Sequence, residues 1–131
     1  MAREKITEKR LTMVDSQLTR RGISDKHVLN AIKTVPRHEF VSFPYKNMAY
    51  IDGPLPIGKG QTISQPYVVA WMSQILEIEE RMKLLEIGTG SAYQAAVLAS
   101  LGAQTYSIEI RPNLARDVKT RLKKLGYNVR V

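Results

Sequence analysis

The sequence predicts an α/β fold with a parallel sheet, and three features support this prediction. From residue 82 onward, short apolar runs alternate with stretches of helical spacing. A Gly-Thr-Gly-Ser turn joins the first apolar run to the helical stretch after it. A single glycine follows each of the two helical stretches. Strands that alternate with helices in this way form parallel sheets with right-handed crossovers.

The bulk properties narrow the class of protein. A chain of 131 residues has the length of one domain, so we expect a single core. The absence of cysteine excludes a disulfide, a thiolate nucleophile and a thiolate-bound metal, and we expect no metal site. No apolar run approaches the roughly 18 to 20 residues that cross a bilayer, and the N-terminus is charged instead of signal-like. We therefore expect a cytoplasmic protein without a membrane partner.

The net charge of +8 is concentrated near the C-terminus. Residues 111–131 contain seven basic residues and one acidic residue, Asp117. Arg116, Lys119 and Lys123 share one face at helical spacing. We favour the solvated outer face of a surface helix over a phosphate-binding stripe, and we expect no nucleic-acid partner.

The N-terminal part predicts two helices. The first carries apolar residues at helix-compatible spacing: Leu11, Met13, Val14 and Leu18. Ser24 is expected to cap the second helix, and Pro36 ends it. The apolar face of that helix comprises Val28, Leu29, Ile32 and Val35.

Residues 36–66 are rich in proline and glycine and predict mostly loop or short strands. Their apolar and aromatic content argues against disorder, which leaves a binding loop as the interpretation. We expect residues 1–65 to form a helical extension with this substrate and cofactor loop. Residues 66–131 then form the first half of the α/β domain, within one structural unit.

The second half of the chain predicts the elements of the sheet in order. After Pro66, the run YVVAWMSQILEI fits a well-buried helix. Strands are expected at residues 82–87 and 105–110, and a third begins at 128–131. Helices are expected at residues 92–101 and 113–125, closed by Gly102 and Gly126.

The segment KLLEIGTGSAY is the most informative for a ligand. Glu86 and Glu109 end neighbouring strands, and the Gly88–Gly90 turn lies between strand and helix, where a cofactor binds in such sheets. The dinucleotide pattern GxGxxG fails, because its third glycine is replaced by Tyr93. Glu86 would repel a pyrophosphate but suits the positively charged amino end of S-adenosylmethionine. Alone, these residues also fit an ordinary turn with solvated strand ends.

Ala92 stands where methyltransferase glycine loops often have a third glycine. The replacement of glycine by alanine has little effect if this residue has helical dihedral angles. Ahead of the turn, GQTISQP at residues 60–66 offers the hydroxyls of Thr62 and Ser64 just before a helix. Judged alone, Ser64 is best explained as a helix cap.

Taken together, the segments GQTISQP (residues 60–66), LEIGTGS (85–91) and YQ (93–94) resemble the protein-L-isoaspartate O-methyltransferase family. VPRHEFV (35–41) and residues 17–23 and 49–58 are similar to that family's N-terminal extension. The GQTISQP segment is the most specific part of the resemblance, because generic methyltransferases lack it.

The resemblance implies a Rossmann-like methyltransferase fold in which this chain lacks the C-terminal half of the sheet. It implies transfer of a methyl group from S-adenosylmethionine to the α-carboxylate of L-isoaspartyl residues in damaged proteins, leaving S-adenosylhomocysteine. The implied catalytic residue is Ser64, which we assign to orienting the substrate or cofactor. The implied cofactor-binding residues are Gln61, Thr62, Ile63, Ser64, Glu86, Gly88, Thr89, Gly90, Glu109 and Ile110.

Members of the family are longer than this chain and continue past the third strand into a GDG-type loop. Two alternatives therefore stay open. One is a non-catalytic cofactor-binding module that self-associates through its open sheet, since an incomplete sheet leaves apolar surface and a free strand edge. The other is a nucleic-acid methyltransferase, which the basic charge suggests.

Overall fold

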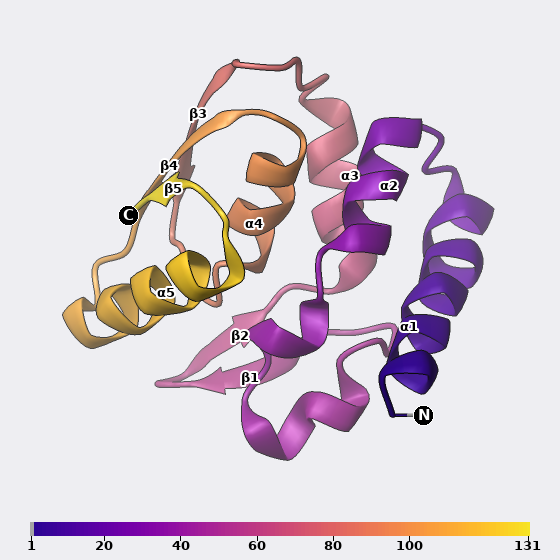
Figure 1. Ribbon diagram of the computed structural model, residues 1–131, viewed down its shortest axis with the longest axis horizontal. Helices are drawn as coiled ribbons and strands as arrows, with labels where there is room; N and C mark the ends of the chain where they lie inside the picture. The colour runs from indigo at the N-terminus through magenta and orange to yellow at the C-terminus, as the bar shows by residue number, and fades with distance from the viewer. Residues whose placement is uncertain (1) are drawn as a thin grey trace.

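The computed structural model describes residues 2–131 and contains a three-stranded parallel sheet. The strands β3 (Lys83–Ile87), β4 (Gln104–Ile108) and β5 (Val129–Arg130) lie in that order across the sheet. Figure 1 shows the sheet at one end of the molecule and α1 at the other, with α4, α3 and α2 between them. The predicted parallel α/β fold is therefore confirmed.

Two helices form the crossovers between the strands. α4 (Tyr93–Ser100) is buried along nearly its whole length, because small and apolar residues surround its axis. α5 (Pro112–Leu125) is amphipathic and buries Leu114, Val118 and Leu122, which are spaced four apart. Its basic residues Arg116, Lys119 and Lys123 are exposed, as expected for an outer helix face.

The N-terminal extension contains α1 (Ala2–Met13) and α2 (Lys26–Thr34), joined by a π-helical and a 3-10 turn. The prediction that Ser24 caps α2 is wrong. Asp25 is the cap, and its carboxylate accepts hydrogen bonds from the backbone N–H groups of His27 and Val28 at 2.9 and 3.2 Å. The backbone N–H of Ser24 donates instead to Gln74. Helix α2 therefore begins one residue later than the serine would have placed it.

The proline-rich segment folds into short 3-10 helices at Arg37–Phe40 and Phe43–Met48, followed by an antiparallel hairpin. The hairpin consists of β1 (Leu55–Gly58) and β2 (Gln61–Ile63). Leu55 and Ile63 pair across the hairpin and are both buried in the main core. The predicted short strands are confirmed, whereas 3-10 helices replace much of the predicted loop before them. Leu55 and Ile63 attach the hairpin to the rest of the fold.

One hydrophobic core joins the N-terminal extension to the sheet region. Its members come from α1, α2, the 3-10 helix Arg37–Phe40, the hairpin, α3, α4 and α5, and include Met13, Ile32, Phe40, Ile63, Val69, Ala96 and Val118. Within residues 2–131, none of the helices has the length and apolar character needed to cross a membrane.

Helix α3 (Pro66–Ile75) corrects a second prediction, because it is not well buried. Only one side of the helix packs inward, through residues such as Val69 and Ala70. Trp71 is 48% exposed and Ile75 is 60% exposed. The spacing of apolar residues correctly predicted a helix. Because apolar residues surround the helix axis, the sequence also indicated burial on all sides, but neighbouring elements cover only one face.

The sheet likewise has one covered and one open face. Side chains alternate along a strand, so Glu86 and Ser107 point toward the covered face while Ile87 and Ile108 point away from it. Leu85, Ile87 and Ile108 are 62%, 74% and 52% exposed. Helices thus cover one side of a sheet that has only the first three strands of a Rossmann-like fold.

Candidate functional site

A cleft of about 230 Å³ opens between the end of the hairpin and the glycine turn. It lies beyond the carboxyl end of β3, where ligands bind in parallel α/β sheets. The lining residues come from the β2–α3 segment, α3, the β3–α4 turn and α4: Thr62, Ile63, Ser64, Val69, Met72, Glu86, Ile87, Gly88, Thr89, Gly90, Ser91, Tyr93 and Gln94. Two segments more than 20 residues apart in the sequence therefore form opposite walls of one cleft.

The glycine turn is shaped by two residues with positive φ. Gly88 has φ 89° and Gly90 has φ 55°, angles that non-glycine residues rarely adopt. A Cβ atom built on either glycine would meet no protein atom within 4 Å, so both present bare backbone toward the cleft. The turn is anchored to the end of β4, because the N–H groups of Gly88 and Thr89 donate to the Ile108 carbonyl at 2.8 and 3.1 Å.

Glu86 is held under the cleft by a chain of hydroxyl groups. The Ser107 hydroxyl donates to Glu86 Oε1 at 2.6 Å, and the Thr89 and Ser107 hydroxyls are 2.6 Å apart. Since the one Ser107 proton is used for Glu86, Thr89 donates to Ser107. Burial raises the pKa of Glu86 to about 7, Ser107 opposes this rise and the nearby Glu109 adds to it. Near neutral pH this carboxyl group is therefore poised between its two charge states.

Glu109 is bound to the same turn from the neighbouring strand end. Its Oε1 accepts a hydrogen bond from the backbone N–H of Gly90 at 3.0 Å, and its Oε2 accepts one from the N–H of Arg111 at 3.0 Å. Strand β4 ends at Ile108, so Glu109 lies one residue beyond the strand. Each carboxylate oxygen has a second lone pair, so Glu109 can still accept hydrogen bonds from a ligand.

The opposite wall is attached to the glycine-turn side through α3 and α4. The side-chain amide of Gln94 in α4 donates to the Ser73 hydroxyl in α3 at 2.9 Å. The carbonyl of Ser64 accepts a hydrogen bond from the buried Arg37 side chain at 2.9 Å. The side chain of Ser64 is exposed, so its hydroxyl group is available at the edge of the cleft.

The cleft brings together most of the residues predicted as a site. Thr62, Ile63, Ser64, Glu86, Gly88, Thr89 and Gly90 all line it. The lining does not include Gln61, Glu109 or Ile110, although Glu109 binds the glycine turn directly and Ile110 is 89% exposed beside it. Thr89 is 4% exposed and uses its hydroxyl within the protein.

Sequence reasoning missed Ser107, Met72 and Gln94. Ser107 pairs with Glu86 across the parallel strands and points to the covered face. A polar residue at an inward position of a strand, opposite an inward carboxylate, is the signal that could have identified it. Met72 lacks such a signal, because it was expected to be one of the core residues of a buried helix. Gln94 had a signal, since it belongs to the Tyr93–Gln94 pair of the family resemblance, but it was not assigned to the site.

Ala92 does not have the helical dihedral angles that would make its replacement of glycine mild. Its φ is 72° and its ψ is 7°, in the left-handed region, and its side chain is completely buried. A left-handed alanine costs about 1–2 kcal/mol relative to glycine. The position therefore has the backbone conformation that favours glycine, with a methyl group packed in the core.

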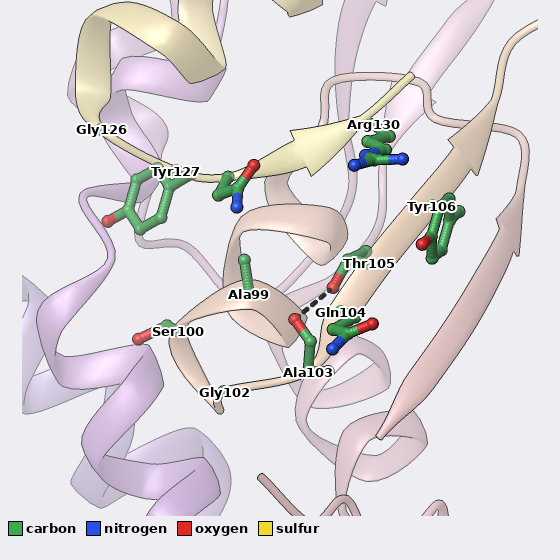
Figure 2. Close-up of a pocket in the computed structure, with 11 residues that line it drawn as sticks. Ala99, Ser100, Gly102, Ala103, Gln104, Thr105, Tyr106, Gly126, Tyr127 and Arg130 are labelled. Atoms are coloured by element: carbon green, nitrogen blue, oxygen red, sulfur yellow. Dashed lines mark hydrogen bonds between the residues drawn. The ribbon is translucent and has the colours of Figure 1, made fainter. Parts of the chain in front are cut away.

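A larger cavity, about 640 Å³, lies at the other end of the strands (Figure 2). It is lined by the end of α4, the start of β4 and the α5–β5 turn, including Gln104, Tyr106, Tyr127 and Arg130. The hydroxyl of Thr105 points back to the Ala103 carbonyl there. Because ligands of parallel α/β sheets bind beyond the carboxyl ends of the strands, we assign the site to the smaller cleft.

The sheet order, the covering helices and the cleft at the glycine turn define a Rossmann-like α/β domain. The family model described as protein-L-isoaspartate(D-aspartate) O-methyltransferase matches residues 8–131. The chain belongs to this family.

Named relatives support the same membership. A protein-L-isoaspartate O-methyltransferase of Gloeobacter violaceus is 56% identical over 120 residues, covering 91% of this chain and 58% of the relative. Protein-L-isoaspartate O-methyltransferase 1 of Syntrophobacter fumaroxidans is 57% identical over 115 residues, covering 88% of this chain and 54% of the relative. The chain thus spans about half the length of the curated relatives that it matches.

Two solved structures share the fold. One, titled protein-L-isoaspartate O-methyltransferase, has a TM-score of 0.79 and 29% identity, covering 95% of this chain and 40% of that chain. The other is a putative protein-L-isoaspartate O-methyltransferase from Plasmodium falciparum in complex with S-adenosyl-L-homocysteine. It has a TM-score of 0.75 and 23% identity, covers 92% of this chain and 61% of that chain, and supports the fold alone.

Proposed function

We propose that this chain supplies the cofactor cleft and part of the substrate site for methyl transfer from S-adenosylmethionine to L-isoaspartyl residues of damaged proteins. The observation that carries the proposal is the meeting of Thr62 and Ser64 with Glu86 and the glycine turn around one cleft. The GQTISQP segment and the LEIGTGS segment are the two parts of the sequence that resemble the family most closely. In the cleft, the Ser64 hydroxyl on the substrate side and the Glu86 carboxylate on the cofactor side therefore lie around the same space.

The residues present fit S-adenosylmethionine. Gly88 and Gly90 face the cleft without side chains, which allows a ligand to approach the backbone. Ionised Glu86 would attract the ammonium group of the methionine part. Glu109, with free lone pairs on both oxygens, would accept hydrogen bonds from the ribose hydroxyls, and Ile110 would lie beside the adenosine.

The bound cofactor supplies a methyl group on a positively charged sulfur, which is a good leaving group. The receiving α-carboxylate is already ionised near pH 7, so the chain needs no general base. We assign Ser64 to hydrogen-bonding and orienting this carboxylate, because its exposed hydroxyl lies at the edge of the cleft. Alignment of the carboxylate oxygen, the methyl carbon and the sulfur then provides the rate enhancement.

Calorimetry and a methyl-transfer assay test the proposal. We expect the chain to bind S-adenosylhomocysteine and to show no binding of NADH, whose pyrophosphate would face two carboxylates. Transfer is measured to a peptide with one isoaspartyl residue, with the matching aspartyl peptide as the control. Ser64→Ala should lower transfer at least about tenfold. Binding of NADH in preference to S-adenosylhomocysteine would contradict the assignment.

A second proposal is that the open sheet face mediates self-association. Leu85 and Ile108 point away from the helices and are more than half exposed, and β3 has a free edge. Trp71 and Ile75 of α3 add exposed apolar area. Sedimentation velocity over a range of concentrations tests this proposal, and a monomer at every concentration would refute it.

The remaining expectations are also proposals. We place the protein in the cytoplasm with isoaspartyl-containing peptides or proteins as partners. The exposed basic face of α5 is proposed to be solvated and not to bind nucleic acid, so RNA and DNA should show no salt-sensitive affinity. We retain the division at residues 65 and 66 between the extension with its loop and the first half of the sheet domain.

A further inference from the structure

Arg37 is a completely buried cation in the N-terminal extension. Burial lowers the pKa of its guanidinium group, an effect that Tyr93 and Tyr50 partly oppose. Among the ion pairs of residues 2–131, none joins Arg37 to a carboxylate. Burying a charge without an ionic partner costs free energy of folding. Hydrogen bonds and an aromatic face must therefore offset the cost of burying the Arg37 guanidinium group.

The compensating contacts come from three separate segments. Arg37 Nε donates to the Ala49 carbonyl at 2.7 Å, and Nη2 donates to the Ser64 carbonyl at 2.9 Å. The guanidinium carbon lies 4.8 Å from the centre of the Tyr93 ring. One planar group therefore connects the loop before the hairpin, the segment after the hairpin and the first residue of α4.

Two of these contacts lie on opposite walls of the cofactor cleft. Ser64 follows β2 and belongs to one wall, whereas Tyr93 follows the glycine turn and belongs to the other. Ser64 is exposed, so few neighbouring atoms hold its side chain in place. The position of its backbone therefore determines where the hydroxyl group lies in the cleft. The rigid fork of an arginine fixes the direction of its hydrogen bonds, which a flexible lysine cannot do at two acceptors.

We propose that Arg37 is a positioning residue that sets the separation between the Ser64 segment and the start of α4, and so the width of the cofactor cleft. This inference rests on the proposed function, because it assigns a role within the same site. Arg37 touches neither the cofactor nor the substrate in this proposal. It acts through the Ser64 carbonyl and the Tyr93 ring.

The alternative is that Arg37 serves only to stabilise the fold. The two roles differ in what a conservative replacement changes. Loss of stability alone lowers the melting temperature but leaves ligand affinity unchanged while the chain stays folded. Loss of positioning weakens ligand binding at temperatures where the chain is fully folded, and it loosens residues 61–64 locally.

The experiment compares Arg37→Lys and Arg37→Gln with Val28→Ala, a core replacement in α2 that lies outside the cleft. Arg37→Gln keeps a donor without a buried charge, in case the lysine variant does not fold. Calorimetry measures S-adenosylhomocysteine affinity well below each melting temperature. Hydrogen exchange by mass spectrometry measures protection of residues 61–64.

We expect at least one folded Arg37 variant to bind S-adenosylhomocysteine about tenfold more weakly, with faster exchange in residues 61–64 and unchanged exchange in α2. Val28→Ala should lower the melting temperature but keep the dissociation constant within about twofold. Folded Arg37 variants with unchanged S-adenosylhomocysteine affinity, or with unchanged exchange in residues 61–64, would overturn the proposal. If the unmodified chain fails to bind S-adenosylhomocysteine, the proposed function fails, whereas hydrogen exchange still tests separately whether Arg37 holds residues 61–64 in place.

Discussion

Replacing Glu86 by glutamine should make the protein more stable at neutral and alkaline pH. The pKa of this carboxyl group is raised from its ordinary value of 4.5 to about 7, mainly by burial. A folded-state pKa above the unfolded value means that the folded chain binds the proton more tightly. The contribution of Glu86 to the free energy of unfolding is therefore fully present below pH 4.5, and it is lost as the pH rises through 7.

The size of the effect follows from the raised pKa. One pKa unit corresponds to about 1.4 kcal/mol, so ionised Glu86 lowers the free energy of unfolding by up to about 3 kcal/mol above pH 8. Glutamine remains neutral and can accept the same hydrogen bond from Ser107 through its carbonyl oxygen. Glu86→Gln should thus match the unmodified chain near pH 4 and exceed it by about 3 kcal/mol at pH 8.

Urea denaturation from pH 4 to pH 9 measures this difference, and Glu79→Gln serves as the control because Glu79 is an exposed surface residue. The difference between Glu86→Gln and the unmodified chain should grow with pH, whereas the Glu79→Gln difference should stay near zero. The same Glu86→Gln variant should bind S-adenosylhomocysteine more weakly, because the ammonium group loses its carboxylate partner. A stability difference that does not change with pH, or a less stable variant at pH 8, would refute the reasoning.

Three further outcomes are expected. Gly88→Ala should cost about 1–2 kcal/mol of stability, measured by urea denaturation, and lower cofactor affinity in calorimetry, because φ is 89° and the new methyl group faces the cleft. Glu109→Ala should weaken cofactor binding about tenfold or more and cost about 1 kcal/mol, because the N–H group of Gly90 loses its acceptor; unchanged affinity would remove Glu109 from the site. Leu85→Glu combined with Ile108→Glu should abolish any self-association in sedimentation velocity while the chain stays folded, because both residues are exposed.

The sheet and its glycine turn could be predicted because the determining signals are local. Apolar runs of strand length, helical spacing and the glycines after each helix indicate the elements one after another. Positive φ angles at Gly88, Gly90 and Gly126 are the conformations that those glycines permit. The observed strands differ from the predicted ones by one or two residues at their ends.

Features that depend on neighbours distant in sequence could not be predicted in this way. The apolar residues of α3 indicated a buried helix, but burial depends on how many elements surround it, and Trp71 has no covering layer. The hydroxyl pair of Thr89 and Ser107 depends on strand register. The role of Arg37 depends on two carbonyls 12 and 27 residues away, whose meeting requires the complete fold.

The charge of the cleft argues for the type of ligand more strongly than its shape does. Two carboxyl groups, Glu86 and Glu109, lie on either side of a turn that exposes bare glycine backbone. A phosphate at this turn would face their repulsion and would raise the pKa of Glu86 further. A cationic ligand has the opposite effect, since it lowers that pKa and releases a proton into solution when it binds. Calorimetry of S-adenosylmethionine in buffers with different ionisation enthalpies should therefore detect proton release near pH 7, and proton uptake would contradict a cationic ligand at Glu86.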